Sequence, residues 1–426
     1  MGAYLPSVRL SVWLEETTFG LFADRISDGS IALAVKLPAS VIKAIQHDAA
    51  VDILGVVVTV GRRNVPLFAV RVHDEPDSPF TAMRGFRRDD EGELLCAALE
   101  SDIRRLHFFD ELSRHVLSCD VTVDKPSALQ LRQRVDEASR FVAVNEDLHE
   151  RAMDLAEHRI KKTQQFSDAA YLVWDVVPIA IDRLDLAEYS AVSETATFGP
   201  FRLDAADEGG LFEETVHELA DEIYGRRAYR SPRGRLGNKE RELTDVLLVA
   251  DDHLIVIEAK ALTKAGVATG DRRGANLKKD LEKAFDQIRG AARFARQGTI
   301  TTRDGQPIDI PDGAARAVLG IVIVSEMHHG PDWREVAGWI QETARKHEVL
   351  INVMDLMELK VLTDNIRTPY ALGPLLAERC VKVLEKGTAF GRVRFRSSRL
   401  RHAMFFLRAL VHWLVMRIRK FRRRNQ

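Results

Sequence analysis

The chain contains few cysteines, and they show no pattern that would bind a metal or build a disulfide framework. Its 426 residues include only Cys96, Cys119 and Cys380. An odd number of widely spaced cysteines without metal-ligand spacing suggests neither a disulfide scaffold nor a zinc cluster, and we expect a reducing compartment. The sequence also lacks a GxxxxGK[ST] phosphate loop and a GxGxxG fingerprint, so any motor or ATPase function would have to come from a separate protein.

Long hydrophobic runs are absent too. No stretch reaches about 18 uninterrupted apolar residues, so no segment is predicted to span a bilayer. The start, MGAYLPSVRLSVWLEE, has no basic region followed by an apolar one, unlike a secretory signal. We therefore expect a soluble, cytoplasmic protein.

Hydrophobic residues make up 46% of the chain, which is ample for more than one core. The order of strand-like and helical segments predicts an α/β protein, with a central mixed sheet flanked by helices. We expect four regions: a sheet-rich α+β domain, a helical linker region, the domain with the mixed sheet, and a helical basic tail. Their predicted boundaries are 1–125, 126–204, 205–370 and 371–426.

The net charge of −1 conceals a strong asymmetry. From Lys386 to the end there are thirteen Lys and Arg and no acid, so the preceding residues carry 49 − 63 = −14. The segment RVRFRSSRLR alternates basic and bulky residues, and an amphipathic helix is predicted after it. Such a tail can pack on the protein or on a partner chain, lie on an anionic membrane, or contact nucleic acid phosphates.

Three charged residues stand inside two apolar runs in ELTDVLLVADDHLIVIEAK, residues 242–260. An even-length turn around Asp251-Asp252 places Asp245 directly opposite Glu258 on antiparallel strands. Lys260, two positions beyond Glu258, then projects from the same face. Charged groups inside buried strands are costly unless something binds them, so this hairpin is the best candidate site.

Two carboxylates about 5 Å apart repel each other, and a hard divalent cation with oxygen ligands relieves the repulsion. We expect Mg²⁺, with Mn²⁺ as an alternative, held by Asp245 and Glu258. The carbonyl of Ala259 supplies a third oxygen. Lys260 would lie beside the ion, where it can orient or deprotonate water or stabilise charge on a phosphate.

An acid on one strand and acid-x-Lys on the next resembles the PD-(D/E)xK phosphodiesterases, the restriction-endonuclease-like superfamily. The resemblance implies a restriction-endonuclease-like core and a metal-dependent nuclease. It also implies a metal-shell glutamate in the upstream helix, for which Glu213 is the first choice and Glu214 the second. Gln287 resembles the polar residue of the downstream helix in several subfamilies. Thr244 stands where the family pattern has proline.

A second acid-x-Lys sequence, Glu358-Leu359-Lys360, cannot form such a hairpin, because its nearest upstream acid, Asp355, is only three residues away. For the first match the alternative interpretation is a surface hairpin whose charges form an ion pair worth roughly 0–1 kcal/mol. The apolar residues on both faces of its strands argue against that alternative.

Two basic stretches flank the hairpin, residues 225–241 and 262–279, and both are expected to be loops that contact a phosphate backbone. The predicted function is a nuclease acting on DNA, with RNA as an alternative substrate and a homodimer as an alternative to a monomer. The competing hypothesis is a non-catalytic scaffold of the same fold, tethered by its tail to a membrane or an assembly.

Overall fold

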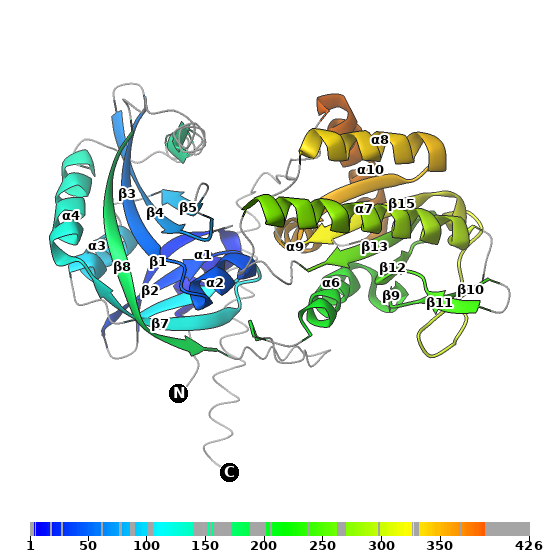
Figure 1. Cartoon of the computed structure of the whole chain (residues 1–426), viewed down its shortest axis with the longest axis horizontal. Helices are drawn as coiled ribbons and strands as arrows, with labels where there is room; N and C mark the ends of the chain where they lie inside the picture. Colours follow the sequence, from blue (N-terminus) through cyan, green and yellow to red (C-terminus); the bar gives the residue numbers. More distant parts are fainter. Residues whose placement is uncertain are drawn as a thin grey trace, which may run out of the picture. The chain divides into compact units, whose positions relative to one another are not determined.

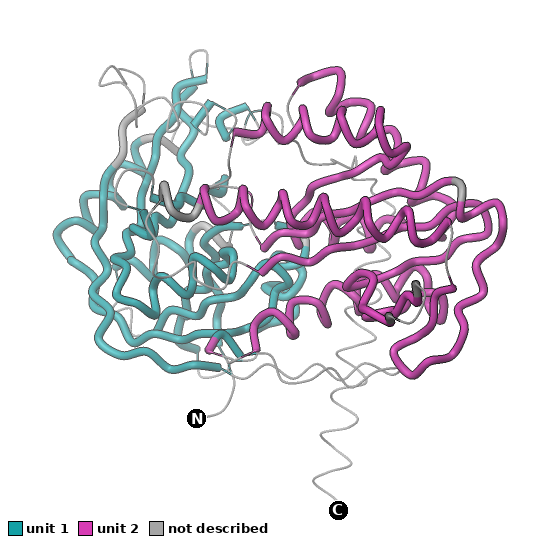
Figure 2. The backbone as a smooth tube through the Cα atoms, turned by 45° about the vertical axis from the view of Figure 1, so that its right-hand side comes forward, with its two compact units in different colours: residues 1–203, 396–426 teal, residues 204–395 magenta. Residues whose placement is uncertain are grey.

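The chain forms two compact units in the computed structural model, residues 1–203 with 396–426, and residues 204–395 (Figure 2). The structure describes residues 4, 6–17, 19–26, 29–60, 63–75, 79–85, 90–100, 105–139, 148, 151–153, 155–156, 172–187, 202–204, 207–236, 239–261, 270–296, 299–325, 327, 332–366 and 368–387. The predicted tail helix, which falls within 388–426, lies outside the described residues.

Unit 1 is built on an eight-stranded mixed sheet with the order β1-β2-β6-β7-β8-β3-β4-β5. Its strands are β1 (Gly20–Arg25), β2 (Ile31–Lys36), β3 (Val51–Val60), β4 (Arg63–Val72), β5 (Phe80–Gly85), β6 (Arg105–Phe109), β7 (His115–Val123) and β8 (Leu172–Leu186). Its helices are α1 (Val8–Glu16), α2 (Ala39–Gln46), α3 (Asp90–Glu100) and α4 (Lys125–Ser139).

The two outer strands of this sheet approach each other. A Cβ atom added to Gly20 of β1 would lie 3.2 Å from the Cβ atom of Arg84 on β5. The Arg84 guanidinium lies 4.4 Å from the centre of the Phe22 ring on β1. The sheet is therefore strongly curled.

The region 126–204 differs from the helical linker that we predicted. After α4, its residues 172–186 form β8, which pairs with β3 and β7 in the middle of the sheet. Along β8 the buried Val177 and Ile179 alternate with the exposed Pro178 and Ala180, which is the period of a strand. The partner strand β3 lies more than a hundred residues earlier, so local sequence offered little evidence for the pairing.

Unit 2 contains a five-stranded sheet with the order β16-β15-β13-β12-β9 and a three-stranded sheet with the order β11-β10-β14. The strands are β9 (Ala228–Arg230), β10 (Arg233–Leu236), β11 (Lys239–Glu242), β12 (Val246–Val249), β13 (Leu254–Lys260), β14 (Thr299–Thr301), β15 (Val318–Val324) and β16 (Leu350–Asp355). The helices are α6 (Glu208–Tyr224), α7 (Gly270–Ala295), α8 (Trp333–His347), α9 (Leu356–Asn365) and α10 (Pro369–Lys386), with short 3₁₀ turns η1 (Gly225–Arg227) and η2 (Ala314–Arg316).

The five-stranded sheet is mixed: β9, β12 and β13 are antiparallel, whereas β13, β15 and β16 are parallel. Helices α6 and α7 lie on opposite sides of β12 and β13 (Figure 1). Leu247 and Val256 pack with Leu281 and Phe285 of α7 in one core. Strands covered on both faces must be apolar on both faces, which is the pattern that the hairpin sequence shows.

These features confirm the predicted α/β class, with a large mixed sheet and several helices. Within the described ranges, no helix combines the length and the apolar character needed to cross a bilayer.

A buried ion pair joins α10 to the end of the five-stranded sheet. The guanidinium of Arg379 donates to both carboxylate oxygens of Glu358, at 2.9 Å each, and to the Val353 carbonyl at 2.8 Å. The side chains of Arg379 and Glu358 are 6% and 0% exposed. The second acid-x-Lys sequence thus begins α9 and forms no hairpin, and residues after 371, expected to open the tail, are the body of α10.

We expect Arg379→Met to lower the free energy of unfolding by roughly 3–5 kcal/mol, because the substitution leaves the Glu358 carboxylate buried without its cation. The matched control is Lys382→Met on the same helix, whose exposed pair with Glu378 should contribute no more than about 1 kcal/mol. Urea unfolding of both variants measures the difference. Equal stability of the two variants would contradict a stabilising role for the buried pair.

Candidate functional site

The hairpin of β12 and β13 brings the three charged residues together at one end of the sheet. The two strands pair antiparallel, with Val246 opposite Ile257, and the turn that joins them closes with a hydrogen bond across an even-length loop. The same register puts Asp245 opposite Glu258, one step beyond the last pair. The predicted register is therefore confirmed.

The side chains of these residues are in direct contact. The Lys260 ammonium lies 2.8 Å from Glu258 Oε2 and 3.7 Å from Asp245 Oδ2. The Ala259 N–H donates to the same Asp245 oxygen over 2.6 Å. The Lys260, Asp245 and Glu258 side chains are 15%, 11% and 0% exposed. The trio thus forms a compact, nearly buried charge cluster.

Two hydrogen bonds hold the backbone just before β12, around Asp245. The Ser231 N–H donates to the Asp245 carbonyl over 2.8 Å, next to the pairing of β9 with β12. On the other side, the Thr244 hydroxyl donates to the Ile257 carbonyl over 2.7 Å. Thr244 is buried, and its hydroxyl lowers the pKa of the neighbouring Glu258, against the larger effect of burial. This hydroxyl makes contacts that a proline at the same place could not make.

Burial governs the ionisation of the carboxylates. It raises the pKa of Glu258 to about 7, with further repulsion from Asp245 and partial compensation by Lys260. Burial likewise raises the pKa of Asp245, against the opposing effect of Lys260 and the Ala259 N–H. Burial alone would lower the pKa of Lys260, but the nearby carboxylates of Glu258, Asp245 and Glu213 raise it. The ammonium is therefore charged at neutral pH.

Glu213 lies within electrostatic reach of this cluster. Burial raises its pKa first, and the next largest contributions come from Asp245 and Glu242. The alternative choice, Glu214, instead faces Arg230, whose guanidinium nitrogen is 3.5 Å from its carboxylate. Of the two glutamates, only Glu213 is thus tied electrostatically to the cluster.

Glu242 is a further acid near the site that we did not predict from the sequence. It contributes to the raised pKa of both Asp245 and Glu213. It lies three residues before Asp245, in the last position of β11. The sequence ELTD contained the signal, but an exposed acid at a strand end is common, and the tertiary structure was needed to select it.

Gln287 lies on α7, and none of its described contacts is with Asp245, Glu258 or Lys260. The next residue, Ile288, packs over Gly320, where an added Cβ would lie 2.7 Å from Ile288 Cγ2. Gly320 pairs with Val256, four residues before Lys260, which is about 13 Å along a strand. The Gln287 Oε1 atom is buried and accepts no hydrogen bond from the described residues.

The stretch 225–241, expected to be a loop, instead forms η1, β9, β10 and β11. Several of its basic groups are engaged with acids: Arg227 contacts Asp251 at 2.5 Å, and Arg233 lies 3.9 Å from Glu240. On β10 and β11, Arg233 faces Glu242 and Arg235 faces Glu240, so opposite charges alternate across the ladder. The expectation of a loop was wrong, because these residues pair as strands, where Glu242 and Glu240 offset part of the positive charge of the stretch.

The second basic stretch, 262–279, is divided. Residues 262–269 lie outside the described residues, and residues from Gly270 onward form the beginning of α7. Lys278 on this helix lies 2.8 Å from Glu335 of α8. This part of the stretch is therefore helical surface and not the expected loop.

The donor set of the cluster suits a hard divalent cation. Two buried carboxylates with raised pKa values face each other, and the Lys260 ammonium now supplies the positive charge between them. Because the N–H and C=O of one residue in a strand point to the same edge, the Ala259 carbonyl lies on the Asp245 side. Within the described ranges, no group of three or more His, Cys, Asp or Glu side chains is arranged to hold a metal, so water would complete the shell.

No protein family, curated protein or solved structure matches this chain.

The raised pKa of Glu258 predicts how stability depends on pH without divalent metal. The ordinary pKa of 4.5 applies to the unfolded chain and a pKa of about 7 to the folded one, so between these values the folded state holds more protons. Stability therefore falls as pH rises from 4.5 to about 7, and the loss is complete above that range.

We expect Glu258→Gln in EDTA to raise the free energy of unfolding by roughly 1–3 kcal/mol at about pH 8, since one pKa unit corresponds to about 1.4 kcal/mol. The gain should vanish below pH 4.5, where wild-type Glu258 becomes protonated in both states. Glu240→Gln, an exposed control, should change stability by less than about 0.5 kcal/mol. Urea titrations across this range measure the effect, and a variant less stable than wild type at high pH would refute it.

Proposed function

We propose that unit 2 is a metal-dependent nuclease domain with a restriction-endonuclease-like core, and that it hydrolyses phosphodiester bonds in DNA. The observation that carries the proposal is the pair of opposed carboxylates, Asp245 and Glu258, with the Lys260 ammonium between them. The order α6, β9, β12, β13, α7, β15 agrees with the helix, hairpin, helix and strand that the family resemblance requires. Their mixed sheet, antiparallel on one side and parallel on the other, supports the same core.

Asp245 and Glu258 would hold the ion through their carboxylates, with the Ala259 carbonyl as a third oxygen. Glu213 would complete the shell through water or by direct contact after a side-chain rotation. When bound, Mg²⁺ or Mn²⁺ supplies Lewis-acid activation of water and neutralises charge at the phosphate. Both carboxylates must lose their protons first, and the raised pKa values make this loss dependent on pH near neutrality.

Lys260 keeps its proton, because the surrounding carboxylates raise its pKa. We assign it the orientation of the attacking water and the stabilisation of negative charge on the phosphate, and not proton abstraction. Gln287 lies apart from the cluster, so we assign it no contact with the ion or the substrate and keep it only as a residue that binds a water through its Oε1 atom, which is buried and accepts no hydrogen bond from the described residues.

The acids around the site affect how a polynucleotide approaches. Asp245 raises the pKa of Glu213 and of Glu258, and Glu242 raises the pKa of Glu213 and of Asp245, whereas Lys260 opposes these effects. A polyanion is repelled from such a surface until a cation neutralises it. Metal binding should therefore precede nucleic acid binding, whether the substrate is DNA or RNA.

The second candidate is a non-catalytic scaffold of the same fold. The low exposure of the trio and the ion pairs that engage Arg227 and Arg233 favour it, since both reduce the surface offered to a polynucleotide. In that case the trio would be a buried stabilising cluster of unit 2.

A plasmid-cleavage assay with Mg²⁺ or Mn²⁺ separates these candidates. We expect wild type to cut DNA, and Asp245→Ala, Glu258→Ala and Lys260→Met to lose activity by about 100-fold or more, as when a group at the reacting centre is removed. Lys360→Met, in the acid-x-Lys sequence of α9, is the matched control and should retain activity.

Equal cutting by wild type and Asp245→Ala would identify a contaminant. Absence of cleavage with either metal on double- or single-stranded DNA and on RNA would reject the nuclease proposal in favour of the scaffold.

A further inference from the structure

Strand β8 of unit 1 has two partners, and each covers only part of its length. β3 pairs with residues 172–179 and β7 with residues 179–186. Beyond Ile179, the edge of β8 that faced β3 meets no other strand of the described chain. An edge of this kind presents backbone donors and acceptors that another extended segment can pair with.

The register identifies which backbone groups face this edge. The Ala187 N–H donates to the carbonyl of Val116 on β7 over 3.0 Å, so the backbone groups of Ala187 point toward β7. Because antiparallel pairs alternate, Asp185 also directs its backbone toward β7, whereas Leu184 and Leu186 direct theirs to the open edge. The Leu186 side chain is 39% exposed, which agrees with an uncovered edge.

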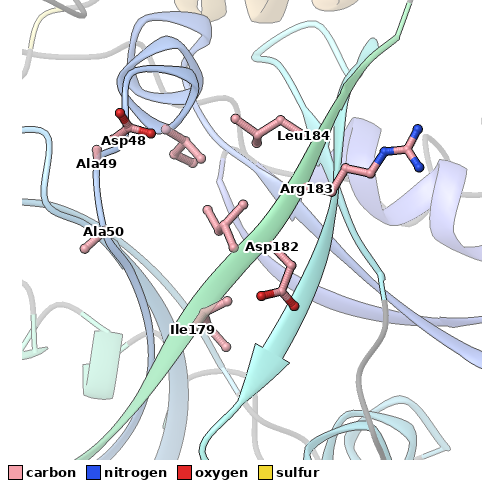
Figure 3. Close-up of a pocket in the computed structure, with 9 residues that line it drawn as sticks. Asp48, Ala49, Ala50, Ile179, Asp182, Arg183 and Leu184 are labelled. Atoms are coloured by element: carbon pink, nitrogen blue, oxygen red, sulfur yellow. The ribbon is translucent and has the colours of Figure 1, made fainter.

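A hollow of about 340 Å³ lies beside this edge, between β8 and the residues that follow α2. Its apolar lining includes Ile45, Ile179 and Leu184, and its two acids are Asp48 and Asp182. Figure 3 shows Asp48 and Asp182 on opposite sides of the hollow.

A strand irregularity adds an acid to the hollow. The ladder with β7 shifts register between Asp120 and Val121, which pair with Arg183 and Ile181, so Asp182 is the extra residue of a bulge. Bulges re-aim side chains and recur beside binding sites.

The acids of the hollow are available to a cation. Asp182 accepts a hydrogen bond from the Thr122 hydroxyl at 2.7 Å, and no basic group of the described chain forms an ion pair with Asp182 or Asp48. The neighbouring Arg183 points away from both acids in Figure 3, and its guanidinium lies 3.1 Å from Asp185. The hollow thus combines an apolar floor, two unneutralised carboxylates and an open strand edge.

We propose that this edge binds an extended basic segment as an added strand, and that the segment is Arg392–Arg396 of this chain. In RVRFR, basic and apolar residues alternate. An extended strand therefore puts Val393 and Phe395 on one face, toward the apolar floor, and the three arginines on the other, toward the rim with its acids. The opposite charges of the tail, +13, and of the preceding residues, −14, favour the association.

Hydrogen exchange of the full chain, resolved to single amides, tests this pairing. In wild type the Leu184 and Leu186 amides should exchange slowly. In Arg392→Glu/Arg394→Glu/Arg396→Glu they should exchange at least about tenfold faster, because the added strand is lost. The Asp185 amide, which faces β7, is the internal control and should be unchanged, which shows that the sheet remains folded.

Two further variants examine the acids. Asp48→Lys/Asp182→Lys should behave like the triple arginine variant. Glu93→Lys/Glu137→Lys, which changes the net charge equally on α3 and α4, should behave like wild type. A synthetic peptide of residues 390–401 added to the triple variant should restore slow exchange, and a peptide of the same composition with contiguous arginines should not.

Fast exchange of Leu184 and Leu186 in wild type would show that the edge is open and would overturn the proposal. Slow exchange in both wild type and the triple variant would also overturn it, since another segment would then cover the edge. The edge and the hollow belong to unit 1, and neither result depends on nuclease activity.

Discussion

The repulsion between two carboxylates that face each other inside a hairpin is the constraint on which the candidate site depends. Asp245 and Glu258 are brought together by strand register, and nearly complete burial removes the water that would otherwise screen them. The Lys260 ammonium and the Ala259 N–H compensate only in part, since the pKa values of both acids stay raised. A site whose negative charge is only partly compensated can bind a cation. The strand register that opposes the two carboxylates therefore provides the metal site that the proposed chemistry needs.

The rest of unit 2 keeps this arrangement rigid. The parallel strands β15 and β16 extend the sheet beside β13, and α7 covers the face that carries the hairpin core. The buried pair of Arg379 with Glu358 fixes α10 and α9 against the last strand. Thr244 ties the start of β12 to the strand that carries Glu258. The departure from the proline of the family pattern therefore has a structural role.

Local pattern predicted the hairpin well but failed where partners are distant. Apolar runs on both sides of an even turn leave one favourable register, so Asp245, Glu258 and Lys260 were grouped from the sequence alone. The residues of β8 alternate as a strand does, yet their partners β3 and β7 come much earlier in the chain, and a helical linker was predicted instead. The basic stretch 225–241 was expected to be a loop because its charges obscured the strand pattern.

The sequence by itself determined the α/β class, the hairpin and its opposed acids, since these follow from hydrophobic period and from neighbours within a few residues. Only the tertiary structure decided which other charges meet the site. It connected Glu213, the first choice from the sequence, with Asp245, brought in Glu242, and packed Ile288, the neighbour of Gln287, over Gly320 of the sheet. Coulombic interaction and burial depend on distances in space. Residues that are far apart along the chain come close together only when the helices pack on the sheet.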